Sequence, residues 1–582
     1  MSARRQTASF AVRLVGFWGA RVNTATAELI LAAAEVDGYD KCVYSVGPYG
    51  IRVGFAFQQN RALNLVAALS AAGKLGDQVR IAVIGAGLAG ITAKLALHGL
   101  GFAQAELIEM EDTAIKTQFG AGHRPIHPCY NTWPIGEHFG PTTRLPFLNW
   151  FAANARDVAA GLREEWDTDL RQHLNSIEYQ VRLRGMRKPV RTAKGTEVTL
   201  RLQGRSAGGR WGNIEPRSYD LVILATGFGQ ERDLSRSVSK SYWSSDTVDR
   251  LREDEEEVIV SGTGDGGLMD FARLSFSTLD GRDLAVRLIG ELRHGRYHRP
   301  RLPDAEDRLE RSAIERKIVD IEAQAANMMP PAVGPSGPFG SDRDNEIAEF
   351  LAAGYRDALK LLNYRAQGWL DKAVVKLDRA QLVGRLVQPF TPVTAPINKL
   401  LVAYVLQRYP QRYQRGLIRK DGRKTMLCLP DGTRHDITDT TCIVRHGAAA
   451  PAYTFSSGYK RRTRGLHQKL ANLVEVERSD IPFCQALPTV ASADPSRPEF
   501  MKFRSELVRK FARQLGVKIR PGGARTAAGG QRWYEFDVDD AGRVPDQDVV
   551  EQFGGYPHDL FGVRLVGVPI EDADDGLARP DR

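Results

Sequence analysis

Apolar runs, glycine-rich turns and amphipathic stretches follow one another along this 582-residue chain. Residues 79–115 contain an apolar run, a glycine turn, an apolar helical stretch and a second apolar run that ends in carboxylates. That order predicts a βαβ unit. Another buried-strand run lies at 219–229, and a further one at 257–261 leads directly into a second glycine turn. We therefore expect an α/β protein.

The segments around these runs predict how the chain is divided. Residues 1–78 form a lead-in with a strand-like run at 42–57 and a helix at 58–73, which we expect to pack on the next unit. Helical patterning dominates residues 303–415 and predicts a helical insertion. We expect four parts, which are the lead-in 1–78, a first domain 79–250, a second domain 251–450 with the insertion, and a C-terminal region 451–582.

Beyond the insertion the pattern changes again. Residues 424–447 alternate like a hairpin around Asp431–Gly432 and end in a strand and a turn similar to those at 219–229. The sequence after about 450 is basic and irregular, and it then predicts a helix near 498–515 and strands at 532–538 and 562–570. The C-terminal region is thus expected to be α+β.

Charge and cysteine content narrow the classes of function. The 80 Lys and Arg residues exceed the 70 Asp and Glu residues by 10, which favours anionic partners such as phosphorylated cofactors. This charge is spread over the chain as on an ordinary solvated surface, so nucleic-acid binding is the less favoured interpretation. The five cysteines lie far apart without a Cys-x-x-Cys pair, which excludes a disulfide framework, a local zinc site and a paired redox dithiol.

No stretch of the sequence predicts a membrane span. The most apolar long stretch, residues 81–103, contains Lys94, His98 and five glycines, and is better explained by a strand, a turn and a helix. We expect a soluble, cytoplasmic protein.

The first glycine turn has the pattern G-x-G-x-x-G between a strand and a helix, which is the context that makes the pattern specific. Gly85 allows the tight turn, Gly87 lets the backbone approach a diphosphate, and Gly90 lets the helix lie close to the strand. The helix start supplies N–H groups and partial positive charge. Glu109, 19 positions after Gly90, can accept the hydroxyls of an adenosine ribose, with Glu111 as the alternative. The predicted loop comprises Gly85, Ala86, Gly87, Leu88, Ala89 and Gly90.

These motifs resemble those of the FAD/NAD(P)-binding flavoprotein oxidoreductase superfamily. The resemblance rests on the first glycine turn with Glu109 and on the run YDLVILATGFG at 219–229. In that superfamily the first motif holds the diphosphate and ribose of FAD, and an Ala-Thr-Gly ending a strand returns beside the cofactor. The resemblance implies an FAD-binding Rossmann-like domain followed by a second Rossmann-like domain, with Ala225, Thr226 and Gly227 as further FAD-binding residues.

The second glycine turn fits the same pattern at Gly262, Gly264 and Gly267. Many members of the superfamily bind NAD(P)H at this place, so the resemblance implies a nicotinamide site. Asp265 opposes this interpretation, because its carboxylate would face a diphosphate in a partly buried loop. Two alternatives stay open, a turn that binds nothing and an S-adenosyl ligand, since the loop is also similar to those of spermidine synthases and methyltransferases. Candidates for contact with a ribose or 2′-phosphate are Glu291, Arg293, Arg296 and Arg299.

A loop dense in polar and aromatic side chains follows the first βαβ unit at 118–134, and such loops on rigid scaffolds often carry chemistry. In flavoproteins this region commonly passes the flavin ring. The resemblance implies Gln118 as a cofactor-binding residue, and the catalytic candidates are Arg124, His127, Tyr130 and Trp133. A structural role is the alternative, because a lone histidine more often serves as a structural hydrogen-bonding group.

Part of this loop is also similar to the F-x-G-x-x-x-H-x-x-x-W-P motif of Baeyer–Villiger monooxygenases, although both spacings differ. The residues concerned are Phe119, Gly122, His127, Trp133 and Pro134. His123 and His127 are four positions apart, but the Arg-Pro-Ile between them opposes a helix, so no metal site is predicted.

Together these features predict an FAD-dependent oxidoreductase, with an NAD(P)H-dependent monooxygenase of a small metabolite as the first choice. The alternatives are an FAD-dependent amine or amino-acid oxidase with a non-binding second domain, and a non-enzymatic binding or sensor protein on the same scaffold. The sequence leaves the substrate and the oligomeric state open.

Overall fold

The structure is a computed structural model. It describes most of residues 24–46, 54–277, 312–328, 337–375 and 380–446, the single residues Leu288 and Leu292, and the backbone of 519–526, 532–538 and 563–566. The larger gaps within 54–277 are 135–142, 228–241 and 244–247.

The first unit is built on a five-stranded parallel sheet in the order β1-β12-β2-β3-β6. Its strands are buried on both faces, as parallel strands usually are. The lead-in is therefore part of this sheet, because β1 pairs with β12 at its edge. The strands are β1 (Val43–Ser45), β12 (Leu221–Leu224), β2 (Ile81–Ile84), β3 (Glu106–Ile108) and β6 (Ile177–Glu178).

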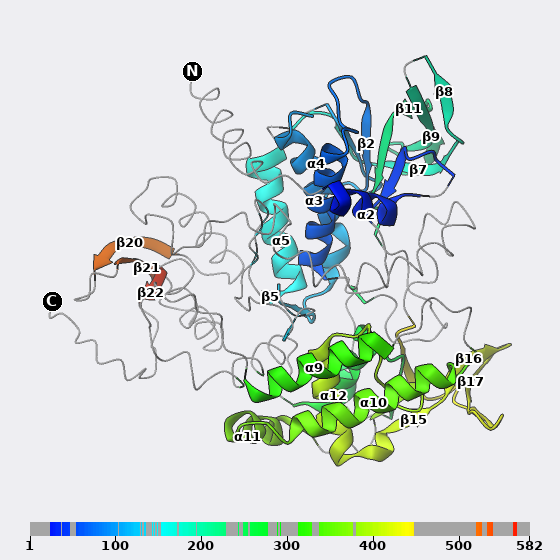
Figure 1. Cartoon of the computed structure of the whole chain (residues 1–582), viewed down its shortest axis with the longest axis vertical. Helices are drawn as coiled ribbons and strands as arrows, with labels where there is room; N and C mark the ends of the chain where they lie inside the picture. The colour runs from blue at the N-terminus through cyan, green and yellow to red at the C-terminus, as the bar shows by residue number, and fades with distance from the viewer. Residues whose placement is uncertain are drawn as a thin grey trace.

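Two different layers cover this sheet (Figure 1). Helices pack against one face, where they surround Ile81 and Val83 of β2. A twisted antiparallel sheet packs against the other face and meets Ala82 and Ile84. The helices are α2 (Thr24–Ala34), α3 (Phe55–Ala71), α4 (Leu88–Gly99) and α5 (Ala155–Glu165), and the strands are β7 (Val181–Met186), β8 (Val190–Thr192), β9 (Gly195–Arg205), β10 (Trp211–Asn213) and β11 (Arg217–Tyr219).

The second unit repeats this three-layer arrangement. Its parallel sheet has the order β15-β14-β13-β19. Helices bury one face of the sheet, and a three-stranded antiparallel sheet meets Ile259 and Val383 on the other face. The strands are β13 (Val258–Ser261), β14 (Ala380–Gly384), β15 (Tyr413–Arg415), β16 (Leu417–Asp421), β17 (Lys424–Cys428), β18 (Arg434–Asp436) and β19 (Thr441–Val444), and the helices are α6 (Val248–Glu253), α7 (Asp265–Ser275), α9 (Ala313–Met328), α10 (Asp342–Leu359), α11 (Tyr364–Ala373) and α12 (Pro396–Arg408).

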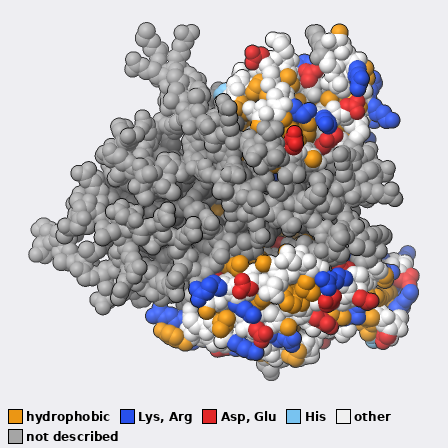
Figure 2. Space-filling model, viewed as in Figure 1, with side chains coloured by type: hydrophobic (Ala, Val, Ile, Leu, Met, Phe, Trp, Pro, Cys, Tyr) orange, Lys and Arg blue, Asp and Glu red, His pale blue; other side chains and the backbone are white. Residues whose placement is uncertain are grey.

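A buried ion pair ties three helices of this unit together. Lys399 on α12 lies 2.7 Å from Glu322 on α9, and the hydroxyl of Tyr355 on α10 donates to the same carboxylate at 2.6 Å. Burial of a charged pair is tolerated when its remaining hydrogen-bonding groups are satisfied, and Lys399 also donates to the carbonyl of Thr391 at 3.1 Å. Blue and red side chains are interspersed on the outer surface of these helices in Figure 2.

The shorter elements complete the chain. Residues 519–566 contribute a three-stranded sheet in which β20 pairs antiparallel and β22 parallel with β21. Among the described residues, no helix is both long enough and apolar enough to span a bilayer. The elements are η1 (Lys116–Gly120), β4 (Pro125–Ile126), β5 (Ala153–Asn154), η2 (Trp166–Leu170), η4 (Pro410–Arg412), β20 (Ile519–Thr526), β21 (Arg532–Val538) and β22 (Val563–Val566).

The predicted α/β class with two Rossmann-like units is confirmed, and several local expectations are corrected. The run 42–57 is a strand only at Val43–Ser45, and its end begins α3. The expected helical insertion 303–415 contains β14, which is the neighbour of β13 in the sheet. The helix expected near 498–515 lies outside the described residues, and the four domain limits stay a prediction.

Candidate functional site

The first glycine turn has a backbone that only glycine satisfies at two positions. Gly85 has φ +103°, and a Cβ there would lie 2.6 Å from the carbonyl oxygen of Ala225. A Cβ at Gly90 would lie 1.7 Å from the carbonyl oxygen of Gly85. The N–H of Gly85 donates to the carbonyl of Ile108 at 2.7 Å, which closes the turn against β3. These contacts explain why the turn, helix α4 and the end of β12 fit so closely.

Gly87 differs because a side chain there would meet no protein atom within 4 Å. It is the N-cap of α4 with φ −66° and ψ 177°, and no side chain caps the helix. The hydroxyl oxygen of Thr226, in the neighbouring Ala-Thr-Gly, is buried with no hydrogen-bond partner among the described residues. An open space in front of uncapped helical N–H groups fits a diphosphate.

Glu109 follows β3 and turns its carboxylate toward this loop. Oε2 accepts the N–H of Ala86, and Oε1 accepts the N–H of Glu111 at 2.7 Å. Burial raises the pKa of Glu109, while these backbone donors act in the opposite direction. The alternative carboxylate, Glu111, instead forms a 2.8 Å ion pair with Lys116.

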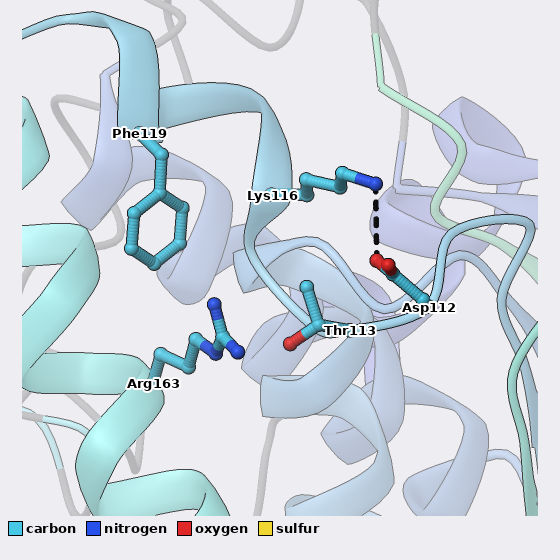
Figure 3. A pocket seen from close by; sticks show the side chains of 5 residues that line it. All are labelled: Asp112, Thr113, Lys116, Phe119 and Arg163. Atoms are coloured by element: carbon cyan, nitrogen blue, oxygen red, sulfur yellow. Dashed lines mark hydrogen bonds and ion pairs between the residues drawn. The ribbon is translucent and has the colours of Figure 1, made fainter.

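A pocket of about 380 Å³ is lined by residues that follow Glu109 in the sequence and by Arg163 of α5 (Figure 3). The Lys116 ammonium lies 3.0 Å from Asp112 across it, and the Arg163 guanidinium lies 5.2 Å from the centre of the Phe119 ring. Gln118 is half-buried on η1, next to the pocket residue Phe119. The lining is Asp112, Thr113, Lys116, Phe119 and Arg163.

The second glycine turn repeats the geometry of the first. Gly262 has φ +123°, and a Cβ there would lie 2.2 Å from the carbonyl oxygen of Arg445. A Cβ at Gly267 would lie 1.9 Å from the carbonyl oxygen of Gly262. The N–H of Gly262 donates to Val383 at 3.0 Å, and Gly264, the N-cap of α7, is open as Gly87 is.

These matching contacts assign the position that corresponds to Glu109. The carbonyl of Val383 accepts the N–H of Gly262, as the carbonyl of Ile108 accepts the N–H of Gly85. The next residue, Gly384, therefore corresponds to Glu109. A Cβ at Gly384 would lie 2.4 Å from Cγ2 of Thr263 and 2.8 Å from the hydroxyl of Tyr413, so no carboxylate fits there. The exposed Arg385 follows directly.

Sequence reading assigned the ribose contact to Glu291 and missed the alternative position at Gly384 and Arg385. Glu291 and the three arginines expected with it, Arg293, Arg296 and Arg299, lie outside the described residues. One of the two strands beside β13 is β14, and its end carries Gly384, which Arg385 follows.

The carboxylate of Asp265 contacts the start of another helix. Its Oδ1 accepts the N–H of Ala395 at 2.6 Å and an Nδ2 hydrogen of Asn398 at 2.9 Å, at the start of α12. The carboxylate is thereby directed to the N-terminus of another helix, where the helix dipole favours negative charge.

The loop at 118–134 sends its large side chains into the second unit. The guanidinium of Arg124 binds the carboxylate of Asp270 on α7 and stacks 4.1 Å from the ring centre of Tyr242. Trp133 is fully buried in the second core and donates from Nε1 to Glu315 at 2.9 Å. Tyr130 donates to Asn398 on α12.

These residues therefore connect the two units. His127 is buried nearby and its carbonyl accepts the N–H of Tyr130 at 3.1 Å. The catalytic roles of Arg124, His127, Tyr130 and Trp133 stay predictions, since the structure assigns partners in the second unit to three of them. Within the described ranges, no group of three His, Cys, Asp or Glu side chains is arranged to hold a metal ion.

Sequence reading also missed Asp270, which is fully buried among three arginines. Arg273 lies 3.2 Å and Arg445 2.7 Å from its oxygens, and Arg124 completes the cluster. These arginines hold the pKa of Asp270 well below its usual range, against the opposing effect of burial. The sequence signal that could have indicated this cluster is the pair Asp270 and Arg273 within the otherwise mainly apolar helix α7.

No protein-family model and no curated protein matches the sequence. Among solved structures, a mutant cyclohexanone monooxygenase from Rhodococcus sp. Phi1 bound to NADP+ is 14% identical, covering 66% of this chain and 73% of that chain with a TM-score of 0.30. An L-lysine 6-monooxygenase from Pseudomonas syringae is 10% identical over 64% of this chain and 81% of that chain, with a TM-score of 0.25. Similarity at this level is limited to the general fold.

Proposed function

We propose that this protein is an FAD-dependent oxidoreductase, and more specifically an NADPH-dependent monooxygenase of a small metabolite. The observation that carries the proposal is the repetition in both units of one glycine turn with an open N-cap, with different residues at the position that corresponds to Glu109. Glu109 stands at the first turn, and Gly384 with Arg385 stands at the second.

The first turn would hold FAD. Gly87 leaves room for the diphosphate, the start of α4 supplies N–H donors, and Glu109 is placed to accept ribose hydroxyls in place of the N–H groups it now binds. The hydroxyl of Thr226 supplies a polar contact at the end of β12. The pocket at Asp112 and Lys116 follows Glu109 along the chain and suits the adenosine end.

The second turn would hold NADPH rather than NADH. A carboxylate at the ribose position favours the free 2′-hydroxyl of NADH, whereas an arginine there accommodates a 2′-phosphate. Gly384 excludes the carboxylate, and the exposed residue Arg385 follows it directly in the sequence. An arginine binds phosphate oxygens in a bidentate manner, which suits this ligand.

When bound, the two dinucleotides would supply hydride and electron-transfer chemistry toward oxygen or an organic substrate. The chain's own residues would bind and orient the two dinucleotides through the two helix N-termini. The loop at 118–134 contacts both units and would hold the two dinucleotide sites in a fixed relative position. Oxygen is the favoured acceptor because the sequence has no Cys-x-x-Cys pair to receive electrons.

The experiment is to release and identify the cofactor of the purified protein, and then to add NADPH or NADH without oxygen. FAD in the extract and bleaching by NADPH support the proposal. The absence of FAD from folded protein contradicts it.

A second candidate is an amine or amino-acid oxidase whose second turn binds nothing. The observation in its favour is Asp265, a carboxylate within a turn that would face a diphosphate. In that case FAD would be bleached by the amine or amino acid and by neither nicotinamide.

A further inference from the structure

A chain of hydrogen bonds joins the first unit to the carboxylate inside the second glycine turn. Tyr130, from the loop after the first βαβ unit, donates to Oδ1 of Asn398. Asn398, on the first turn of α12, donates from Nδ2 to Asp265 at 2.9 Å. The same oxygen of Asp265 accepts the N–H of Ala395 at 2.6 Å.

Asp265 is the residue whose orientation matters most for a diphosphate at this turn. It follows Gly264, the open N-cap of α7, and corresponds to Leu88 in the first turn. A free carboxylate there would stand a few ångströms from the ligand's negative charges and would weaken binding by about tenfold or more. Directed to the start of α12, it is partly neutralised by two donors and by the helix dipole.

We propose that Asn398 and Tyr130 are positioning residues for a nicotinamide dinucleotide, because they hold the Asp265 carboxylate against α12 and away from the diphosphate. The inference rests on the proposed NADPH site. It also explains how a turn with an aspartate, which by itself opposes a diphosphate, is compatible with one.

The burial of Asn398 and Tyr130, which form the hydrogen-bond chain to Asp265, supports this role. Asn398 is 1% exposed, so its amide group is held in one environment by the protein rather than by solvent. Burial, together with the nearby Tyr242 and Asp265, raises the pKa of Tyr130 well above its usual value, so its hydroxyl remains a donor. Asn398 accepts with Oδ1 and donates with Nδ2, which only an amide of this length does in this place.

The loop that supplies Tyr130 holds α7 at a second point, since Arg124 binds Asp270 on the same helix. Arg124 thus contacts α7 directly at Asp270, and Tyr130 is linked to Asp265 through Asn398. The position of the second glycine turn therefore depends on the contacts of the loop at 118–134 with α7 and α12.

The test is the affinity of the FAD-loaded, full-length protein for NADP+, measured by isothermal titration calorimetry. Asn398→Leu should raise the dissociation constant by about tenfold or more, and Tyr130→Phe by about threefold. Asp265→Asn alone should change it by less than about twofold. In the Asp265→Asn background, both Asn398→Leu and Tyr130→Phe should lose their effect on NADP+ affinity.

The matched control is Tyr404→Phe, which removes a hydroxyl bound to Asp371 at 2.6 Å from the same helix α12 but leaves Asp265 untouched. It should leave the NADP+ affinity unchanged, and FAD content should be normal in every variant. If Asn398→Leu fails to fold, Tyr130→Phe with and without Asp265→Asn makes the same comparison.

An equal loss of affinity with and without Asp265→Asn would overturn the inference, because the effect would then not pass through that carboxylate. Failure of the proposed nicotinamide site shows itself differently. In that case the unmodified protein does not bind NADP+, and both proposals fall together.

Discussion

Replacement of Asp270 by asparagine should be among the most destabilising single changes in the chain. The carboxylate is fully buried and contacts the guanidinium groups of Arg124, Arg273 and Arg445. Asp270→Asn keeps the shape of the side chain and removes its charge. Three guanidinium groups, each at most 1% exposed, would then lose the negative charge of this carboxylate.

The magnitude follows from the cost of leaving a buried charge without its partner, which is about 3–5 kcal/mol for one pair. Because three buried arginines contact Asp270, we expect a loss near the upper end of that range, about 5 kcal/mol. Arg124→Met should cost less, about 2–3 kcal/mol, since Asp270 keeps two arginines and the losses are the hydrogen bonds of Arg124 and its stacking on Tyr242.

Urea unfolding, followed by tryptophan fluorescence, measures these differences in the free energy of unfolding. The control is Asp371→Asn, because Asp371 is 45% exposed in its ion pair with Arg408 and should contribute about 1 kcal/mol or less. A loss for Asp270→Asn no larger than for Asp371→Asn, or smaller than for Arg124→Met, would refute the reasoning.

The pH dependence of the same measurement has a defined sign. The folded pKa of Asp270 is lowered, so its contribution is present above the unfolded value of about 3.9 and is lost only as the pH falls through the lower folded value. The difference between the unmodified protein and Asp270→Asn should therefore be constant between about pH 5 and pH 8.

Two further predictions concern other parts of the chain. Arg385→Ala should raise the dissociation constant for NADP+ by about tenfold or more while changing that for NAD+ by less than about twofold, as measured by calorimetry, and equal losses for both would remove the assigned 2′-phosphate contact. Burial lowers the pKa of Lys94 to about 8, so the unfolded chain binds more protons between about pH 8 and pH 10.4 and the protein should gain stability there as the pH rises. Lys94→Met should abolish that gain in pH-dependent unfolding, and an unchanged slope in the variant would contradict the assignment.

Local patterns predicted the two glycine turns well because each is encoded within a few residues. Gly85 and Gly262 both need a positive φ, and Gly90 and Gly267 both touch a backbone oxygen, so the requirement for glycine is visible in the sequence itself. The hairpin near Asp431–Gly432 was predictable for the same reason, and β17 and β18 pair as expected.

Features that depend on distant residues were not predictable. β14 lies more than 100 residues after β13, and the helices α7, α9, α10 and α11 lie between them in the sequence. Its place beside β13 is therefore decided by packing rather than by any local signal. The pair Arg124–Asp270 is separated by 146 positions, and no pattern near either residue indicates the other. Gly384 and Arg385 could be recognised as a ribose position only after β14 had been placed.

The FAD content of two matched variants tests the central claim most directly, namely that the first turn holds FAD and the second holds a nicotinamide. Gly87 and Gly264 have extended backbones and no protein atom within 4 Å of an added Cβ, so Gly87→Val and Gly264→Val fill the ligand's space without disturbing the fold. We predict that Gly87→Val is purified without FAD, and that Gly264→Val keeps FAD but is no longer reduced by NADPH under anaerobic conditions. Loss of FAD from Gly264→Val together with its retention in Gly87→Val would contradict the account.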